Sequence, residues 1–477
     1  MNLINALRTS DSVTENGMAT NSSSLNFCVD LFFQIGAMRG KDKQRLINAF
    51  VKAYNEDALT AIRLLFWARD VRGGAGERQI FKDLIKYLAE NHSDVVNKNL
   101  HLIPEFGRWD DLLVLFNSEV EQSMLSLIAK GLDDKNQLCA KWLPRPNSND
   151  FVTKQQVNKI RKYLNLTPKE YRKLIVGLSN TVEQLMCSNK WDNIDYSKLP
   201  SKAMSNLMKA FGKNDTERFV AYLKSLEKGE TKINAGAIYP YDVVKNLKSG
   251  NSQGANLQWN ALPNYMENSN ERILPLVDVS GSMETPAGNN KAVTCMDVAI
   301  SLGLYISERN VGDFKDAFIT FHSNPELLVL KGTLNERYSQ MARSTWGTTT
   351  DLHAAFKLIL NQAVKHNVEQ KDMPTMLLIL SDMEFNQAIR GGYNLTAQNM
   401  IEQMYSKAGY IMPKIVYWNI RSRSDSNKPV SFDTNGTALV SGFSPSLLTN
   451  LLAGKDMTPY SMMMTVVNSD RYKEITV

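Results

Sequence analysis

The sequence predicts a multidomain chain: an N-terminal all-α module of helical repeats, followed by an α/β domain with a doubly wound sheet. Three observations predict it. Apolar residues recur at helical spacing from about residue 25 to 247, and near-continuous apolar strands alternate with helices after residue 272. In addition, 477 residues are too many for one ordinary core. Apolar residues make up 43% and charged residues 22%, as in globular proteins.

The first part of the chain divides into an arm and a helical module. Residues 1–24 are rich in Asn, Ser and Thr, which predicts a loosely held arm. Within 25–249, apolar residues three and four apart predict helices joined by short turns. The glycine-rich segment 71–78 follows a helix and lacks the Lys-Ser/Thr ending of a nucleotide loop, so it predicts a turn. Stacked helix pairs of this kind predict a HEAT-like solenoid, either open or closed into a ring.

Residues 250–271 are polar and predict a linker, after which residues 272–477 predict the α/β domain. Near-continuous apolar strands separated by helices indicate a mostly parallel sheet that is covered on both faces. Ligands of such sheets bind beyond the carboxyl ends of the strands. The expected strands are 273–277, 317–321, 327–330, 376–380, 415–419 and 437–440, and the expected helices are 293–308, 351–365, 396–407 and 445–453.

Oxygen-bearing side chains follow two of these strands. Asp278, Ser280 and Ser282 alternate directly after strand 273–277, and Asp382 follows strand 376–380. Thr350, the last of three consecutive threonines, precedes a predicted helix. Hard oxygen ligands of this type suit Mg²⁺ or another divalent cation, which keeps a coordination position open. The alternative is that Asp278 and the serines only cap the next segment.

This pattern resembles the metal-ion-dependent adhesion site (MIDAS) of von Willebrand factor A domains. The resemblance implies that Ser280, Ser282 and Thr350 ligate magnesium directly, while Asp278 and Asp382 hold it mostly through waters. Thr349 is the alternative to Thr350. Glu384 could suggest a hydrolase, but no general base or nucleophile can be placed beside the ion, so we expect no enzymatic activity.

The rest of the chain carries a second resemblance. Segments 69–78, 106–112, 141–145 and 232–240 resemble an uncharacterised family, found among other places in phages, that joins a helical module to an A domain. Its layout is similar to the Ro autoantigen, in which a ring of helical repeats, the TROVE module, is closed by an A domain. Ro proteins bind small noncoding RNAs on the outer surface of the ring and single-stranded RNA ends in its hole. The resemblance therefore implies an RNA-binding ribonucleoprotein component.

The distribution of charge bears on RNA binding. Up to Tyr265 there are 36 Lys and Arg against 28 Asp and Glu, and after it 19 against 21. Segment 154–173 combines a basic cluster with two tyrosines, which can hold phosphates and stack unpaired bases. A solvated helix face with inward tyrosines is the alternative. The candidate RNA-binding residues are Arg69, Arg72, Arg78, Lys154, Lys159, Arg161, Lys162, Lys169, Arg172 and Lys173.

The leading functional hypothesis is a non-enzymatic RNA-binding scaffold with a magnesium site. It predicts salt-sensitive binding of small noncoding or single-stranded RNA that survives chelation. The alternative is a protein-interaction or phage-assembly module whose metal accepts an acidic side chain from a partner, so that binding is lost on chelation. The sequence has no apolar run of transmembrane length and no secretory signal, so we expect a cytoplasmic protein without a membrane partner. Its four dispersed cysteines predict reduced thiols.

Overall fold

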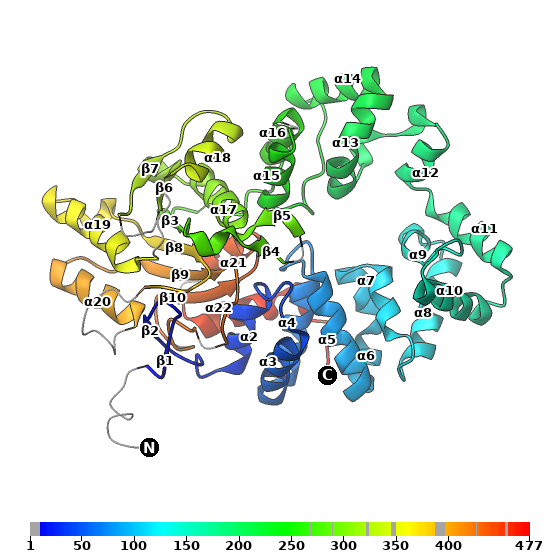
Figure 1. Ribbon diagram of the computed structural model, residues 1–477, viewed down its shortest axis with the longest axis horizontal. Helices are drawn as coiled ribbons and strands as arrows, with labels where there is room; N and C mark the ends of the chain where they lie inside the picture. The colour runs from blue at the N-terminus through cyan, green and yellow to red at the C-terminus, as the bar shows by residue number, and fades with distance from the viewer. Residues whose placement is uncertain are drawn as a thin grey trace. The chain divides into compact units, whose positions relative to one another are not determined.

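The computed structural model describes residues 10–250, 252–267, 269–288, 290–320, 324–344, 350–386, 396–425, 427–453 and 457–477 (Figure 1). The chain forms two compact units. Met1–Thr60 and Ile238–Ser469 form the sheet unit, and Ala61–Ala237 with Asp470–Val477 form the helical unit. The predicted combination of an all-α part and an α/β part is therefore confirmed.

The sheet unit contains a six-stranded sheet in the order β10-β9-β8-β3-β6-β7. The strands are β3 (Ile273–Val277), β6 (Ala317–Thr320), β7 (Leu327–Val329), β8 (Met376–Ser381), β9 (Lys414–Asn419) and β10 (Thr437–Ser441). Neighbouring strands are parallel except for β6 and β7. Every residue of β3 and β8 is buried, because both faces of the sheet are covered.

The order places β3 and β8 at the point where the chain direction across the sheet reverses. From β3 the chain continues to β6 on one side, and from β8 it continues to β9 on the other. The register pairs Val277 with Leu380, so both strands end at the same edge. This edge is where open α/β sheets bind their ligands.

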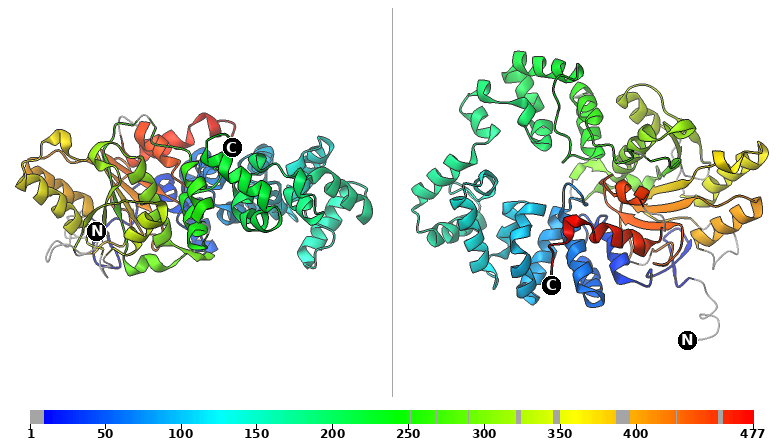
Figure 2. Two further views of the ribbon diagram at one scale, coloured as in Figure 1. Left: turned by 90° about the horizontal axis from the view of Figure 1, so that it is seen from above. Right: turned by 180° about the vertical axis from the view of Figure 1, so that it is seen from behind.

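Ten helices of the sheet unit lie among the described residues. They are α2 (Phe27–Ile35), α3 (Lys43–Glu56), α15 (Pro240–Lys248), α16 (Ser252–Asn260), α17 (Cys295–Arg309), α18 (Leu334–Ala342), α19 (Leu352–Lys365), α20 (Ala397–Ala408), α21 (Leu447–Ala453) and α22 (Pro459–Val467). Helix α17 packs against β3, β6 and β8. Gly303 allows this approach, because a Cβ there would lie 2.6 Å from Val277 Cγ2. Helices α19 and α20 lie side by side in every view (Figure 2).

The helical unit is a succession of helices, several of which pack on the next helix along the chain (Figure 1). They are α4 (Ala58–Arg69), α5 (Arg78–Asn91), α6 (Ser93–Asn99), α7 (Ile103–Phe106), α8 (Glu121–Asp133), α9 (Gln137–Trp142), α10 (Phe151–Tyr163), α11 (Pro168–Ser179), α12 (Val182–Cys187), α13 (Ser201–Asn214) and α14 (Thr216–Glu227). The glycine-rich segment forms the predicted turn between α4 and α5. Gly74 is required there, because a Cβ would lie 1.9 Å from the Trp67 carbonyl oxygen.

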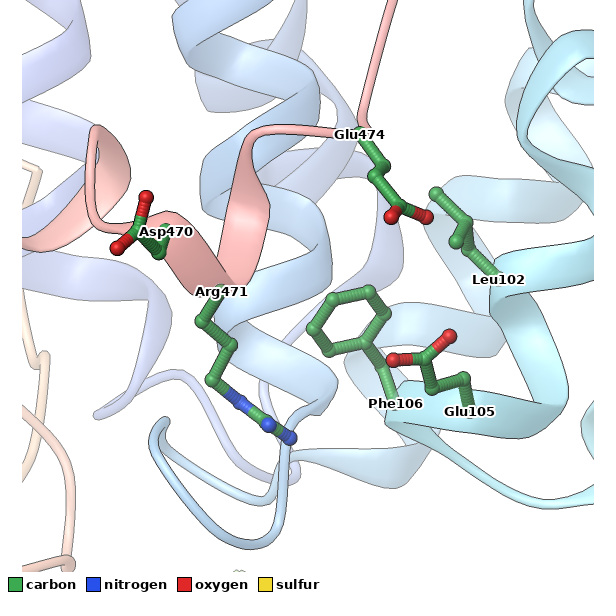
Figure 3. A pocket seen from close by; sticks show the side chains of 6 residues that line it. All are labelled: Leu102, Glu105, Phe106, Asp470, Arg471 and Glu474. Carbon is green, nitrogen blue, oxygen red and sulfur yellow. The ribbon is translucent and has the colours of Figure 1, made fainter.

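The C-terminal residues 470–477 pack into the helical unit. The buried carboxylate of Asp70 accepts hydrogen bonds from Arg471 Nη2 at 2.7 Å and from the Tyr472 hydroxyl at 3.0 Å. The Tyr472 ring stacks on Phe106 with centroids 5.4 Å apart. Figure 3 shows the pocket of about 260 Å³ beside this contact; it is lined by Leu102, Glu105, Phe106, Asp470, Arg471 and Glu474. The tail therefore fixes the turn after α4.

The compact units do not follow the predicted domain ranges. Helices α2, α3 and α15, expected in the 25–249 module, belong to the sheet unit, because α2 packs on β9 and β10 and α15 packs on α17. The expected linker 250–271 contains α16, in which Trp259 is buried. The described part of the arm is also held in place: β1 (Ser12–Val13) pairs with β2 (Ala19–Thr20), and Ala19 and Asn21 form β-bridges with Thr396 and Lys428. Apolar periodicity located these helices but not their packing partners.

Candidate metal-binding site

Asp278 lies fully buried at the end of β3. Its Oδ1 accepts a hydrogen bond from the Ser280 amide at 2.9 Å, and its Oδ2 accepts one from the Ser381 hydroxyl at 2.6 Å. The turn that follows brings the hydroxyl oxygens of Ser280 and Ser282 to 3.1 Å from each other. One carboxylate and two hydroxyls of the predicted set therefore converge beyond this strand.

Asp382 follows the adjacent strand β8 and is 2% exposed. Its Oδ2 makes no hydrogen bond within the described structure, and its nearest charged partner is Arg423 Nη1 at 3.6 Å. A buried carboxylate oxygen without a hydrogen bond is costly unless something compensates its charge. The position is suited to a cation or to water bound by one.

The two aspartates interact strongly. Burial, and then the negative charge of Asp382, raise the pKa of Asp278 from 3.8 to about 7. Burial also raises the pKa of Asp382, although the Ser282 side chain and Arg423 oppose this. Two buried carboxylates that lie close together destabilise the folded protein when both are ionised, unless added positive charge balances them. The set therefore fits a divalent cation.

Thr350 lies in the same part of the sheet unit. It is buried, its amide donates to Asn386 Oδ1 at 3.0 Å, and its carbonyl accepts from the Asn386 amide at 2.9 Å. Asn386 stands four residues after Asp382, so these bonds attach the threonine to the segment that carries the second aspartate. The alternative ligand Thr349 lies outside the described residues.

Glu384 has a structural role in the described part of the chain. Its Oε2 accepts from the Glu15 amide at 2.7 Å and its Oε1 from Asn427 Nδ2 at 2.6 Å. One oxygen therefore attaches the N-terminal arm, and the other attaches the loop that carries Asn427. Sequence reasoning did not identify Asn386 or Arg423 as neighbours of the site. Neither residue could be recognised from its spacing to the predicted ligands, because both lie in loops.

In the metal-free protein, the stability of the sheet unit is expected to fall as pH rises from about 4 to about 7. Because the pKa of Asp278 is about 7 in the folded state and 3.8 ordinarily, the folded state binds more protons in this window. The favourable contribution is thus complete below pH 4 and lost as pH passes 7. Thermal unfolding in EDTA between pH 4 and 8 measures this, and Asp278→Asn should remove the Asp278 part of the slope. A slope that is unchanged in this variant would contradict the assignment.

The predicted RNA-binding residues differ in burial and in their partners. Arg69 is buried and its Nε lies 2.7 Å from Asp111 Oδ2, so its charge is not available to RNA. Arg78 pairs with Asp110 and Asp111, Lys159 with Glu121, and the Arg161 Nε donates to Asn158. The other six candidates are exposed, and Lys154 among them interacts electrostatically with Asp150: Arg72, Lys154, Lys162, Lys169, Arg172 and Lys173.

The two tyrosines of this segment differ. Tyr171 is fully buried and its hydroxyl donates to the Pro144 carbonyl at 3.1 Å, so it is a packing residue. Tyr163 is 40% exposed. Of the two tyrosines, only Tyr163 is therefore accessible for base stacking, and the basic side chains of α10 and α11 are the main feature of this surface.

The described residues were also searched for other functional features. They contain no group of three or more His, Cys, Asp and Glu side chains that could hold a metal ion. None of their helices is both long enough and apolar enough to span a membrane. All four cysteines are free thiols, and only Cys187 is exposed. The site at the ends of β3 and β8 thus depends on hydroxyls and two carboxylates.

Comparison with known proteins gives matches along nearly the whole chain. Residues 14–138 and 125–271 match the family described as Domain of unknown function (DUF2828), and residues 273–474 match Domain of unknown function (DUF7788). "Uncharacterized protein L728" of Acanthamoeba polyphaga mimivirus is 30% identical, over 96% of this chain and 87% of that protein. The crystal structure of the Deinococcus radiodurans RO (RSR) protein is similar with a TM-score of 0.47 and 13% identity, over 93% of this chain and 99% of that one.

Proposed function

The chain belongs to the Domain of unknown function (DUF2828) family, and from its geometry we propose a non-enzymatic, RNA-binding scaffold that holds a divalent cation at the Asp278–Asp382 site. The observation that carries the RNA part is the group of exposed basic residues on α10 and α11. Such residues neutralise phosphates without reading sequence. The resemblance of the chain's layout to Ro proteins leads to the same proposal.

The cation part rests on the two buried aspartates and the hydroxyls beside them. Ser280, Ser282 and Thr350 would hold the ion, with Asp278 and Asp382 balancing its charge. Magnesium would supply an open coordination position that accepts an anionic oxygen. The aspartates keep the hydroxyl-bearing turn in place, since the Asp278 carboxylate accepts from the Ser280 amide.

Replacing Lys162, Lys169 and Lys173 together by Gln should weaken RNA binding and reduce its salt dependence. For single-stranded RNA each lost phosphate contact lowers the slope of log affinity against log salt by about 0.7, so the triple variant should lose about 2. Fluorescence anisotropy with a labelled oligoribonucleotide at several salt concentrations measures both quantities. The matched control replaces Lys190, Lys213 and Lys224, three other exposed lysines of the helical unit.

Ultraviolet crosslinking in cells, followed by sequencing of the RNA that remains after a high-salt wash, identifies the natural ligand. Enrichment of a few small RNAs by the wild type but not by the triple lysine variant would support the proposal. Equal salt slopes for the triple variant and its control would contradict it.

A second candidate function is supported by Asp382 Oδ2, which is buried and makes no hydrogen bond within the described structure. In this alternative the cation accepts a carboxylate from a protein partner, as in particle assembly. Partner capture from the native source, with and without EDTA, distinguishes the two. Binding that is lost with EDTA and with Asp278→Ala, and indifferent to the lysine variant, would favour the protein partner. RNA binding that survives EDTA would favour the scaffold.

A further inference from the structure

A basic pocket of about 250 Å³ lies in the sheet unit beside the candidate cation site. Five separate segments line it: the loop between α2 and α3, residues 285–288, the first residue of α17, the segment after β9 and the segment after β10. Its volume is several times the roughly 30 Å³ that one water molecule occupies in the liquid. The pocket could thus hold a group much larger than a single water.

Three of the lining residues, Arg39, Lys41 and Arg421, are cationic, and none of the lining residues is acidic. Within the described residues, the Lys41 ammonium makes no hydrogen bond or ion pair. Burial, and then the charges of Arg421 and Arg45, lower the pKa of Lys41. Cations gathered in a half-buried pocket repel one another and are poorly solvated, so an anion among them would relieve both costs.

The pocket is held in shape before any ligand binds. The Ser422 amide donates to the Ala37 carbonyl at 3.1 Å, and Arg45 Nη2 donates to Ser422 Oγ at 2.7 Å, which joins the α2–α3 loop to the end of β9. The Arg39 guanidinium lies 4.4 Å from the centre of the Phe443 ring. Gly288 leaves room for the Arg39 stem, because a Cβ there would lie 2.3 Å from Arg39 Cγ.

We propose that this basic pocket binds a phosphate group. The Lys41 ammonium and the Arg421 guanidinium supply charge-assisted donors that phosphate oxygens accept, and Arg39 adds positive charge to the lining. Arg421 Nη1 also donates to the Ser282 carbonyl at 3.5 Å, so the pocket contacts the turn that carries two of the proposed cation ligands. The pocket and the cation site are nevertheless built from different side chains, and phosphate binding here does not require the cation.

The first test titrates inorganic phosphate into the full-length protein by isothermal calorimetry, in EDTA and in Mg²⁺. Lys41→Gln should weaken binding about tenfold, because a charge-assisted hydrogen bond is lost. Lys315→Gln, an exposed lysine of the same unit with no acidic partner among the described residues, should leave the affinity unchanged. Circular dichroism of both variants checks that they are folded.

Saturable binding that persists in EDTA and is weakened by Lys41→Gln alone would support the proposal. No binding by the wild type would overturn it, and so would equal binding by Lys41→Gln. Binding that disappears in EDTA but survives Lys41→Gln would overturn it as well, since the phosphate would then occupy the cation site.

The source of the phosphate is resolved by two further probes. A nucleoside monophosphate tests a free nucleotide, and a short oligoribonucleotide with and without a 5′-phosphate tests the end of an RNA chain. Each should show the same dependence on Lys41 if it uses the pocket, and the tighter of the two indicates the source. If neither depends on Lys41, the proposal fails.

Discussion

Saturating Mg²⁺ is expected to raise the melting temperature of the wild-type protein by roughly 5 to 10 °C, and Asp278→Asn to abolish the increase. A ligand that binds only the folded state at 100 times its Kd stabilises it by about 2.7 kcal/mol, and each kcal/mol shifts the melting temperature by about 2 to 4 °C. Asparagine removes one of the two charges that balance the cation while keeping the size of the side chain. Differential scanning calorimetry with and without Mg²⁺ measures the shift.

The same variant separates a metal site from a merely structural aspartate. In EDTA, Asp278→Asn should be no less stable than the wild type near pH 7, because it removes the repulsion between two buried carboxylates. Asp313→Asn, at an exposed carboxylate of the same unit, should keep the full Mg²⁺ effect. A wild type that does not respond to Mg²⁺, Mn²⁺ or Ca²⁺ would contradict the assignment of the site.

Asp70→Ala should destabilise the helical unit by about 3 kcal/mol, close to the cost of removing one partner from a buried ion pair. Asp70 is fully buried and accepts from Arg471, from Tyr472 and from the amides of Arg72 and Gly73 at 3.0 and 3.2 Å. Arg471 is one third exposed, so solvent screens part of its interaction. The larger share of the loss comes from the donors left without an acceptor.

Urea denaturation followed by tryptophan fluorescence measures this loss, and removal of residues 470–477 should reproduce it. Asp133→Ala, at an exposed position of α8, is the control. Arg471→Met combined with Asp70→Ala should be less destabilising than the sum of the two single changes, because the residues share one interaction. If Asp70→Ala and the truncation both changed stability by less than about 0.5 kcal/mol, the tail would have no such role.

The sequence was sufficient to predict the sheet and the position of Asp278 and Asp382 at its edge for a specific reason. Buried parallel strands are apolar without interruption, so β3 and β8 stand out, and a polar residue directly after such a strand has a fixed place at the sheet edge. Asp278 and Asp382 satisfy this condition. The structure places them close enough for the charge of one to raise the pKa of the other.

The features that could not be predicted depend on contacts between residues that are far apart in the sequence. The arm was expected to be loosely held because its composition is polar, yet Glu384 anchors it through the Glu15 amide. Helix α2 has ordinary helical periodicity, and nothing in its sequence indicates that it packs on β10. Arg69 was a candidate RNA contact, but Asp111, 42 residues later, neutralises its charge. Charge patterns alone do not reveal such partners.

The packing of α2 on β10 has a consequence for synthesis of the protein. The Ser441 hydroxyl donates to the Phe32 carbonyl across 409 residues. The apolar face of α2 therefore cannot be buried against β10 until β10 has been synthesised. At about 5 to 20 residues per second, this delay is roughly 20 to 80 s. The intervening helical unit can form most of its local contacts during that time, apart from those of its C-terminal tail. The N-terminal helix is therefore the segment of the nascent chain that is exposed longest to aggregation and to chaperones.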